Sequence, residues 1–251
     1  MKLKIASFNI SGGFYIGNED TEYLDRQAAK TFDNRMLNQI IDTINKENID
    51  VICFQEIITT KSVEYIQKIA DNTELRYFDF FELSPCNLVE NTDCGVAIMS
   101  KFPIKNSVKG LFPNPRIAKT TSSGKTYYTF DKGYICSNID ANGTELKVFT
   151  HHGFPFRRFN STPEANLPVF EHFNEVLIAE NPDVVTGDFN AENFMELIDI
   201  LPKAYQRTIN TITTVDGKSF DDILIREGRT FSSNLIKLLS DHFIVMTELE
   251  I

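Results

Sequence analysis

Short apolar runs recur along this chain, and they alternate with segments whose apolar residues have helical spacing. Residues 51–54 form one such run, which is continuous and therefore typical of a strand buried on both faces. Residues 34–48 instead carry apolar side chains three or four positions apart, as one face of an amphipathic helix requires. Alternation of buried strands with amphipathic helices restricts the chain to an α/β architecture.

The same two patterns predict the other elements of the chain. Strands are expected at residues 2–9, 50–55, 75–83, 95–99, 126–130, 133–139, 145–150, 183–186, 221–225 and 243–249. Helices are expected at residues 34–48, 62–71, 164–180 and 193–200. Turn residues separate the strands between residues 75 and 150, which predict a meander of antiparallel strands.

This β-rich middle part is flanked on both sides by alternating helices and strands. No flexible linker and no repeat of fixed period interrupts the pattern. We therefore expect a single domain over residues 1–251. The fold that suits it is a four-layer α/β sandwich, in which two mixed β-sheets pack face to face with helices on the outside.

Composition excludes several classes of protein. The chain has 25 basic and 35 acidic residues and a formal net charge of −10, which argues against a broad basic surface for nucleic acid. It lacks the run of about 18 apolar residues that a transmembrane helix needs, and its start turns polar too soon for a signal peptide. We expect a cytoplasmic monomer, or a secreted protein if a leader has been removed.

The four cysteines form no Cys-x-x-Cys pair, which argues against zinc-finger and thioredoxin-type sites. Cys53 and Cys136 lie in apolar runs and are expected to be buried thiols. Cys86 and Cys94 leave a second interpretation open, a disulfide across the loop between them.

Polar side chains stand where predicted strands end, or directly before the last strand. Because strand ends meet at one edge of a sheet, such residues are natural components of a site. They are Asn9, Glu56, His151, His152, Asp188, Asn190, Asp241 and His242. Each alone could be an ordinary turn or surface residue, but together they combine oxygen ligands with imidazoles. Oxygen ligands suit Mg²⁺, Mn²⁺ or Ca²⁺, and such a site can perform metal-assisted phosphoryl transfer.

Seven motifs in sequence order carry a family resemblance. They occupy residues 5–10, 54–56, 94–104, 149–151, 187–191, 220–224 and 239–242. Together they resemble the signature blocks of the endonuclease/exonuclease/phosphatase superfamily, which has the deoxyribonuclease I-like fold. The resemblance covers essentially the whole chain.

The resemblance implies a metal centre and a water-activating group. Glu56 would be the principal divalent-metal ligand, and Asn9 and Asp241 would help to complete its coordination sphere. Asp188 would orient or deprotonate the attacking water, and Asn190 would bind an oxygen of the phosphate.

The resemblance also implies two catalytic histidines. His242 would contact the scissile phosphate, and Asp221 would hold its tautomer. His151 would stabilise or protonate the leaving group, although its neighbour His152 remains an alternative at a distance of one residue. The nearby pair Arg157-Arg158 would bind substrate.

We therefore expect a Mg²⁺-dependent hydrolase of phosphate esters, with Mn²⁺ or Ca²⁺ as alternative ions. An endo- or exonuclease-type phosphodiesterase is the leading form, and nucleic acid its expected partner. The alternatives are a phosphatase or phospholipase-type enzyme acting on inositol phosphates, sphingomyelin or another small phosphoester, and a non-catalytic binding module.

The chain has no tryptophan, which weighs against an abasic-site nuclease. Basic residues in the middle third are either a phosphate track or scattered solvated charges; they are Lys101, Arg116, Lys119, Lys125 and Lys132.

Overall fold

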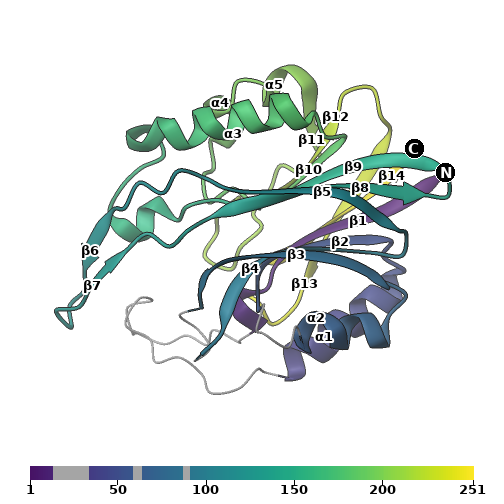
Figure 1. Ribbon diagram of the computed structural model, residues 1–251, viewed down its shortest axis with the longest axis horizontal. Coiled ribbons are helices and arrows are strands. Elements are labelled where there is room, and N and C mark those ends of the chain that lie inside the picture. The colour runs from purple at the N-terminus through teal and green to yellow at the C-terminus, as the bar shows by residue number, and fades with distance from the viewer. Residues whose placement is uncertain (14–33, 59–63, 87–90) are drawn as a thin grey trace.

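Two mixed β-sheets of six strands each lie face to face in the computed structural model (Figure 1). The structure describes residues 1–13, 34–58, 64–86 and 91–251. Helices cover the outer face of each sheet (Figure 1), so the expected four-layer α/β sandwich is confirmed. None of the described helices is long and apolar enough to span a membrane.

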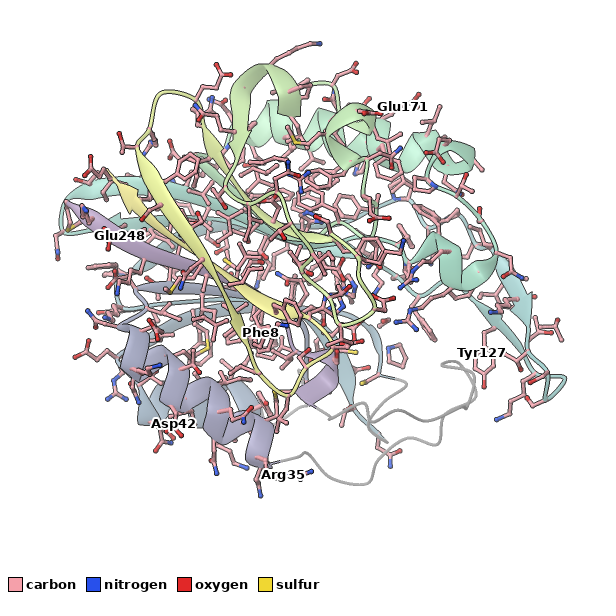
Figure 2. The ribbon with its side chains drawn as sticks, turned by 180° about the vertical axis from the view of Figure 1, so that it is seen from behind. Phe8, Arg35, Asp42, Tyr127, Glu171 and Glu248 are labelled. Atoms are coloured by element: carbon pink, nitrogen blue, oxygen red, sulfur yellow. The ribbon has the colours of Figure 1, made fainter. Side chains whose placement is uncertain are left out.

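The first sheet has the strand order β13-β14-β1-β2-β4-β3. Its strands are β1 (Lys2–Asn9), β2 (Val51–Ile58), β3 (Tyr77–Pro85), β4 (Asp93–Ser100), β13 (Phe231–Lys237) and β14 (Phe243–Glu250). On its outer face lie α1 (Asn34–Glu47) and α2 (Glu64–Asn72). Ile40 of α1 and Ile66 of α2 pack with Phe8 and Phe54, which point to this face of the sheet. Phe8 lies deep among the strands in Figure 2, whereas Asp42 of α1 points to solvent.

The second sheet has the strand order β11-β12-β10-β9-β8-β5. Its strands are β5 (Ile104–Leu111), β8 (Gly133–Ala141), β9 (Thr144–His152), β10 (Val184–Asp188), β11 (Tyr205–Arg207) and β12 (Asp221–Arg226). Its helices are α3 (Leu167–Glu180), α4 (Phe194–Leu197) and α5 (Leu201–Ala204). Phe173 and Leu177 of α3 pack against Phe149 and Val185 of the sheet.

The remaining elements are short. A two-stranded hairpin, β6 (Ala118–Thr120) and β7 (Thr126–Tyr128), projects from the body of the molecule (Figure 1). The described residues contain three 3₁₀ turns, η1 (Ser11–Gly13), η3 (Phe156–Phe159) and η4 (Glu164–Asn166).

Cys53 is a buried thiol, as expected, and its burial raises its pKa to about 12. Cys86 and Cys94 both remain thiols, so the alternative of a disulfide between them is wrong.

Side chains alternate between the two faces of each strand, and this alternation fills the space between the sheets. Leu3 and Ile5 of β1 belong to the inter-sheet core, whereas Ala6 and Phe8 face the helices. Val148 of β9 likewise belongs to the inter-sheet core. Apolar side chains from both sheets therefore form one continuous layer in the middle of the molecule.

The structure corrects two expectations about the secondary structure. The expected meander is divided, because β3 and β4 belong to the first sheet while β5, β8 and β9 belong to the second. The expected helix at residues 193–200 is only one turn long, because the backbone at Ile198 is extended, and α5 then begins with Pro202 in its first turn. Four described strands were not expected: β5, β6, β11 and β13.

Candidate active site

The inter-sheet layer becomes polar at one end of the strands. The face of β1 that carries Leu3 and Ile5 ends in Asn9, and the face of β10 that begins with Val184 ends in Asp188. Asn9 Nδ2 donates a hydrogen bond of 3.0 Å to Asp188 Oδ2 and so joins the two sheets. The sandwich therefore brings polar residues that are 179 positions apart into contact.

Asp188 lies at the centre of the resulting network and is 1% exposed. Asn190 donates to it twice, from the backbone N–H to Oδ1 at 2.8 Å and from Nδ2 to Oδ2 at 3.1 Å. Burial, together with the neighbouring Asp221 carboxylate, raises the pKa of Asp188 above its usual value, although Asn9, Asn190 and the nearby His242 oppose the shift. A buried carboxylate with a raised pKa is suited to accept a proton near neutral pH.

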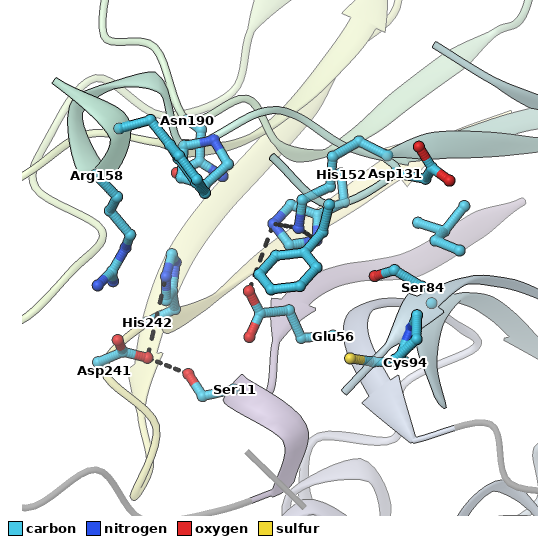
Figure 3. Close-up of a pocket in the computed structure, with 17 residues that line it drawn as sticks. Ser11, Glu56, Ser84, Cys94, Asp131, His152, Arg158, Asn190, Asp241 and His242 are labelled. Atoms are coloured by element: carbon cyan, nitrogen blue, oxygen red, sulfur yellow. Dashed lines mark hydrogen bonds and ion pairs between the residues drawn. The ribbon is translucent and has the colours of Figure 1, made fainter. Parts of the chain in front are cut away.

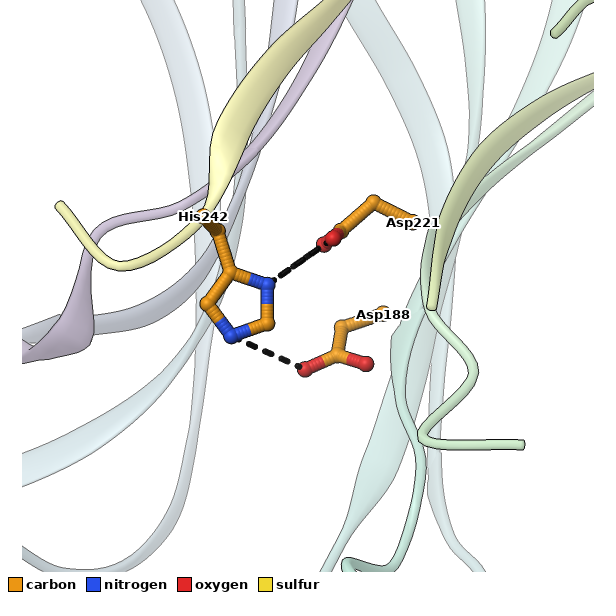
Figure 4. Close-up of side chains that lie close together, drawn as sticks. All are labelled: Asp188, Asp221 and His242. Atoms are coloured by element: carbon orange, nitrogen blue, oxygen red, sulfur yellow. Dashed lines mark hydrogen bonds and ion pairs between the residues drawn. The ribbon is translucent and has the colours of Figure 1, made fainter. Parts of the chain in front are cut away.

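His242 and Asp221 form a buried pair beside Asp188 (Figure 4). His242 Nδ1 lies 2.8 Å from Asp221 Oδ2, and its Nε2 lies 3.9 Å from Asp188 Oδ2. Burial alone lowers the pKa of His242, but the charge and hydrogen bond of Asp221, with Asp188 and Asp241, hold it well above its usual value. The imidazolium form is therefore favoured, as binding of a phosphate oxygen requires.

Glu56 and Asp241 are the residues best placed to hold a divalent ion. Both line the pocket that also contains His152, Asn190 and His242, and in Figure 3 the Asp241 carboxylate lies beside His242 while that of Glu56 lies beside His152. Among the described residues, none donates a hydrogen bond to Glu56, whereas Ser11 Oγ donates one to Asp241 Oδ1. Two carboxylates facing a pocket fit Mg²⁺, which is commonly bound by one or two carboxylates and by substrate oxygens.

A local irregularity of β2 directs Glu56 into this pocket. The pairing of β2 with β4 shifts between Gln55 and Ile57, and Glu56 has a φ of 51°. Such a bulge turns one side chain away from its place in the strand. Gly95 pairs with Ile57 there, and a Cβ at Gly95 would lie 1.9 Å from the carbonyl oxygen of Phe81. The close approach of β3 therefore requires glycine opposite the bulge.

A second group of potential metal ligands lies next to Glu56 and Asp241. Asp188, Asp221 and His242 each place one ligand atom within 4.8 Å of the other two. Their atoms are already engaged with one another and with Asn9 and Asn190, so they fit a hydrogen-bonded catalytic group better than a metal centre.

The structure does not bring Asn9 into the pocket with Glu56 and Asp241. Its side chain is 1% exposed, Nδ2 donates to Asp188, and Oδ1 accepts a 3.0 Å bond from the N–H of Ser11. Both ends of its carboxamide therefore have hydrogen-bond partners, and Asn9 is not among the residues that line the pocket.

The structure brings His152, and not His151, to the pocket. His152 Nε2 lies 3.6 Å from both Glu56 Oε1 and Asp188 Oδ2. His151 points to the opposite face of β9, where its ring centroid lies 4.5 Å from that of Phe173 and 4.3 Å from that of Phe189. Neither ring nitrogen of His151 has a partner among the described residues, and burial lowers its pKa to about 3. Strand alternation causes the difference, because His152 shares a face with Val148 of the inter-sheet core.

The two arginines have different environments. Arg158 lines the pocket. Arg157 Nη2 lies 2.5 Å from Asp216 Oδ2, and its guanidinium lies 5.2 Å from the ring centroid of Phe220. Only Arg158 of this pair is therefore in place to meet a substrate in the pocket.

Several polar residues of the pocket are not among the candidates that the sequence provides, and they include Ser11, Ser84 and Asp131. The sequence identifies Lys132 only as one of several basic residues in the middle third. Lys132 directly precedes β8, so strand alternation gives no signal for its direction. Its burial, with 8% of the residue exposed, becomes visible only in the folded chain.

Comparison with known proteins gives one family and several similar structures. The model of the "Endonuclease/Exonuclease/phosphatase family" matches residues 6–242. No curated protein sequence matches the chain significantly. An endonuclease/exonuclease/phosphatase from Bacteroides vulgatus has 16% sequence identity and a TM-score of 0.65, over 100% of this chain and 99% of that chain.

Two further structures cover the whole chain. A humanized D. rerio TDP2 has 18% identity and a TM-score of 0.61, over 100% of this chain and 99% of that chain. Sphingomyelinase C from Streptomyces griseocarneus has 13% identity and a TM-score of 0.64, over 100% of both chains. These likenesses concern the fold, and the family match extends from β1 to the His242 of the site. The chain therefore belongs to the endonuclease/exonuclease/phosphatase family.

Proposed function

We propose that this protein hydrolyses phosphate esters with the help of a divalent cation, and that it is a phosphodiesterase of the endo- or exonuclease type. The observation that carries the proposal is the buried His242–Asp221 pair, which meets Asp188 beside a pocket lined by Glu56 and Asp241. In-line attack of water on a phosphate needs a bound cation, a proton acceptor and positive charge at the phosphate. In this proposal Glu56 and Asp241 hold the cation, Asp188 is the proton acceptor and the His242 imidazolium supplies the charge.

Each side chain has a defined task in this proposal. Asp188 accepts a proton from the attacking water, and Asn190 binds a phosphate oxygen. His242 neutralises the charge that develops on the phosphate, while Asp221 keeps its Nδ1 engaged and its Nε2 directed to the pocket. Glu56 and Asp241 would hold Mg²⁺, or Mn²⁺ or Ca²⁺ in its place, which when bound supplies positive charge to the phosphate and lowers the pKa of water.

His152 takes the position on the leaving-group side that the motif spacing gave to His151. Its Nε2 faces Glu56 and Asp188, whereas His151 is enclosed by phenylalanines. Arg158 contributes a further cation at the rim of the pocket.

Substituting His151 and His152 one at a time shows which of the two histidines acts in hydrolysis. His152→Asn is expected to reduce kcat roughly ten- to hundred-fold, because a group that acts on the reacting atoms is lost. His151→Leu is expected to leave kcat nearly unchanged and the free energy of unfolding equal or higher, because a buried polar group without a partner costs about 1–3 kcal/mol. Steady-state hydrolysis and urea unfolding of both variants provide the measurement. Loss of activity in His151→Leu alone would contradict this assignment.

A basic hairpin beside the pocket favours a nucleic acid over a small phosphoester. Residues 113–130 contain three basic residues, Arg116, Lys119 and Lys125, and no acidic one, although the chain as a whole has a net charge of −10. The segment ends at Phe130, which lines the pocket together with the next two residues, Asp131 and Lys132. A polynucleotide bound in the pocket could therefore extend along the hairpin.

Salt dependence distinguishes these substrate classes. For a polynucleotide, kcat/KM is expected to fall steeply with salt, and the double variant Arg116→Gln/Lys125→Gln should reduce the logarithmic slope by roughly one per cation removed. The matched double variant Lys46→Gln/Lys68→Gln removes the same charge from α1 and α2 and should leave the slope unchanged. A flat salt profile, with faster hydrolysis of sphingomyelin or inositol phosphates, would instead favour the small-substrate alternative.

A further inference from the structure

Lys132 is a buried cation that forms no ion pair with any carboxylate of the described residues. The residue is 8% exposed, and its Nζ lies 3.0 Å from His152 Nδ1 and 3.2 Å from His152 Nε2. Within the described parts of the chain, its ammonium forms no ion pair within 4.0 Å. Arg207 of the second sheet, which is half-buried, does have an ion-pair partner, because its Nε lies 2.6 Å from Asp222 Oδ2.

Burial of a charge without an ion-pair partner is costly, and proteins normally compensate it with a partner or a ligand. Burial lowers the pKa of Lys132, although the more distant Glu56 and Asp188 carboxylates oppose this shift. Lys132 also lines the pocket itself, together with Phe130 and the acidic residues Glu56, Asp131 and Asp241. When a divalent cation neutralises the carboxylates, an anion that enters the pocket would be stabilised by the buried ammonium.

The geometry places His152 and His242 against the same carboxylate oxygen of Asp188. His242 Nε2 lies 3.9 Å from Asp188 Oδ2, and His152 Nε2 lies 3.6 Å from the same oxygen. Lys132 lies on the His152 side of this group, because its ammonium contacts the His152 ring. In Figure 3, His152 and His242 lie apart across the pocket, and the Glu56 carboxylate lies next to His152.

We propose that Lys132 is a substrate-binding residue, whose ammonium contacts the phosphoryl group on the His152 side of the pocket while His242 contacts it from the other side. The inference rests on the proposed function, because it names a second fixed cation for the same phosphate. Lys132 then supplies positive charge next to the leaving oxygen, and His152 acts as its hydrogen-bond acceptor when no substrate is bound.

Binding of inorganic phosphate tests this role without relying on turnover. Titration calorimetry in Mg²⁺ is expected to show a Kd that rises roughly ten- to hundred-fold in Lys132→Met, the scale of losing a charged hydrogen bond. Lys132→Arg retains the charge and should restore most of the affinity. His151→Leu is the control, because its side chain lies on the opposite face of β9. Affinity for Mg²⁺, measured separately, should be similar in all four proteins.

The outcomes keep this inference distinct from the proposed hydrolysis. If folded Lys132→Met binds phosphate as tightly as wild type, Lys132 only positions His152 and the proposal is overturned. Failure of wild-type protein to bind phosphate in Mg²⁺ would also overturn it. Should Lys132→Met not fold, Lys132→Gln provides the same comparison. Absence of hydrolysis by a wild-type protein whose phosphate affinity depends on Lys132 would count against the proposed function alone.

Discussion

Replacement of Asp188 by Asn is expected to lower kcat by at least about two orders of magnitude, the scale of removing a general base. An amide cannot accept the proton of the attacking water, and it would present an N–H₂ group to the donors of Asn9 and Asn190. Steady-state hydrolysis in Mg²⁺ measures the loss, and circular dichroism checks that the variant is folded.

Asp183 offers a matched control for this substitution. It directly precedes β10, whereas Asp188 ends that strand, and its Oδ1 lies 2.5 Å from Arg229 Nη2. Asp183→Asn is therefore expected to affect stability but not kcat. Equal turnover in folded Asp188→Asn and wild type would show that this carboxylate is not the proton acceptor.

Replacement of His242 by Ala is expected to have a similarly large effect, about two orders of magnitude in kcat, because a preorganised cation at the phosphate is lost. The Asp221→Asn variant gives a more specific readout, since it retains the imidazole. Asp221 raises the pKa of His242, so its removal lowers that pKa. In Asp221→Asn the His242 imidazolium therefore loses its proton at a lower pH than in the wild type. Because activity falls when that proton is lost, the alkaline limb of the kcat/KM profile should move to lower pH.

Measurement of kcat/KM between about pH 5 and 10 tests this shift, with the interval chosen to bracket ordinary histidine titration. Thr213 Oγ1 donates to Asp221 Oδ2 at 2.9 Å, and Thr213→Val provides a milder perturbation of the same carboxylate. Movement of the alkaline limb to higher pH in Asp221→Asn would contradict the role assigned to the pair.

Much of the fold could be predicted from sequence because strand and helix periodicity is local. The pattern from Leu3 to Asn9 identifies β1, and it also shows which side chains share a face. The same argument applied to β9 would have selected His152, since it has the parity of Leu146 and Val148. Motif spacing instead favoured His151, which shows that alternation is the better guide to direction within a strand.

The other differences arise from contacts between distant parts of the chain. Which sheet receives β5 depends on its pairing with β8, across about thirty residues, and no local pattern contains that choice. The bulge that directs Glu56 depends on β4 and on the close approach of β3 at Gly95. The environment of Lys132 is created by His152 from the neighbouring strand. Sequence motifs therefore identified several residues that the structure places around the pocket, and tertiary pairing determines which side chains face it.

The most direct test of the central claim is hydrolysis by the purified protein in Mg²⁺, in Mn²⁺ and in EDTA. The substrates are single- and double-stranded DNA, RNA, sphingomyelin and inositol phosphates, and His242→Ala is assayed in parallel. We expect cleavage of one substrate class in Mg²⁺ that EDTA abolishes, that restored Mg²⁺ recovers, and that the folded variant lacks. Undiminished cleavage in EDTA, or by His242→Ala, would contradict the proposed metal-dependent mechanism.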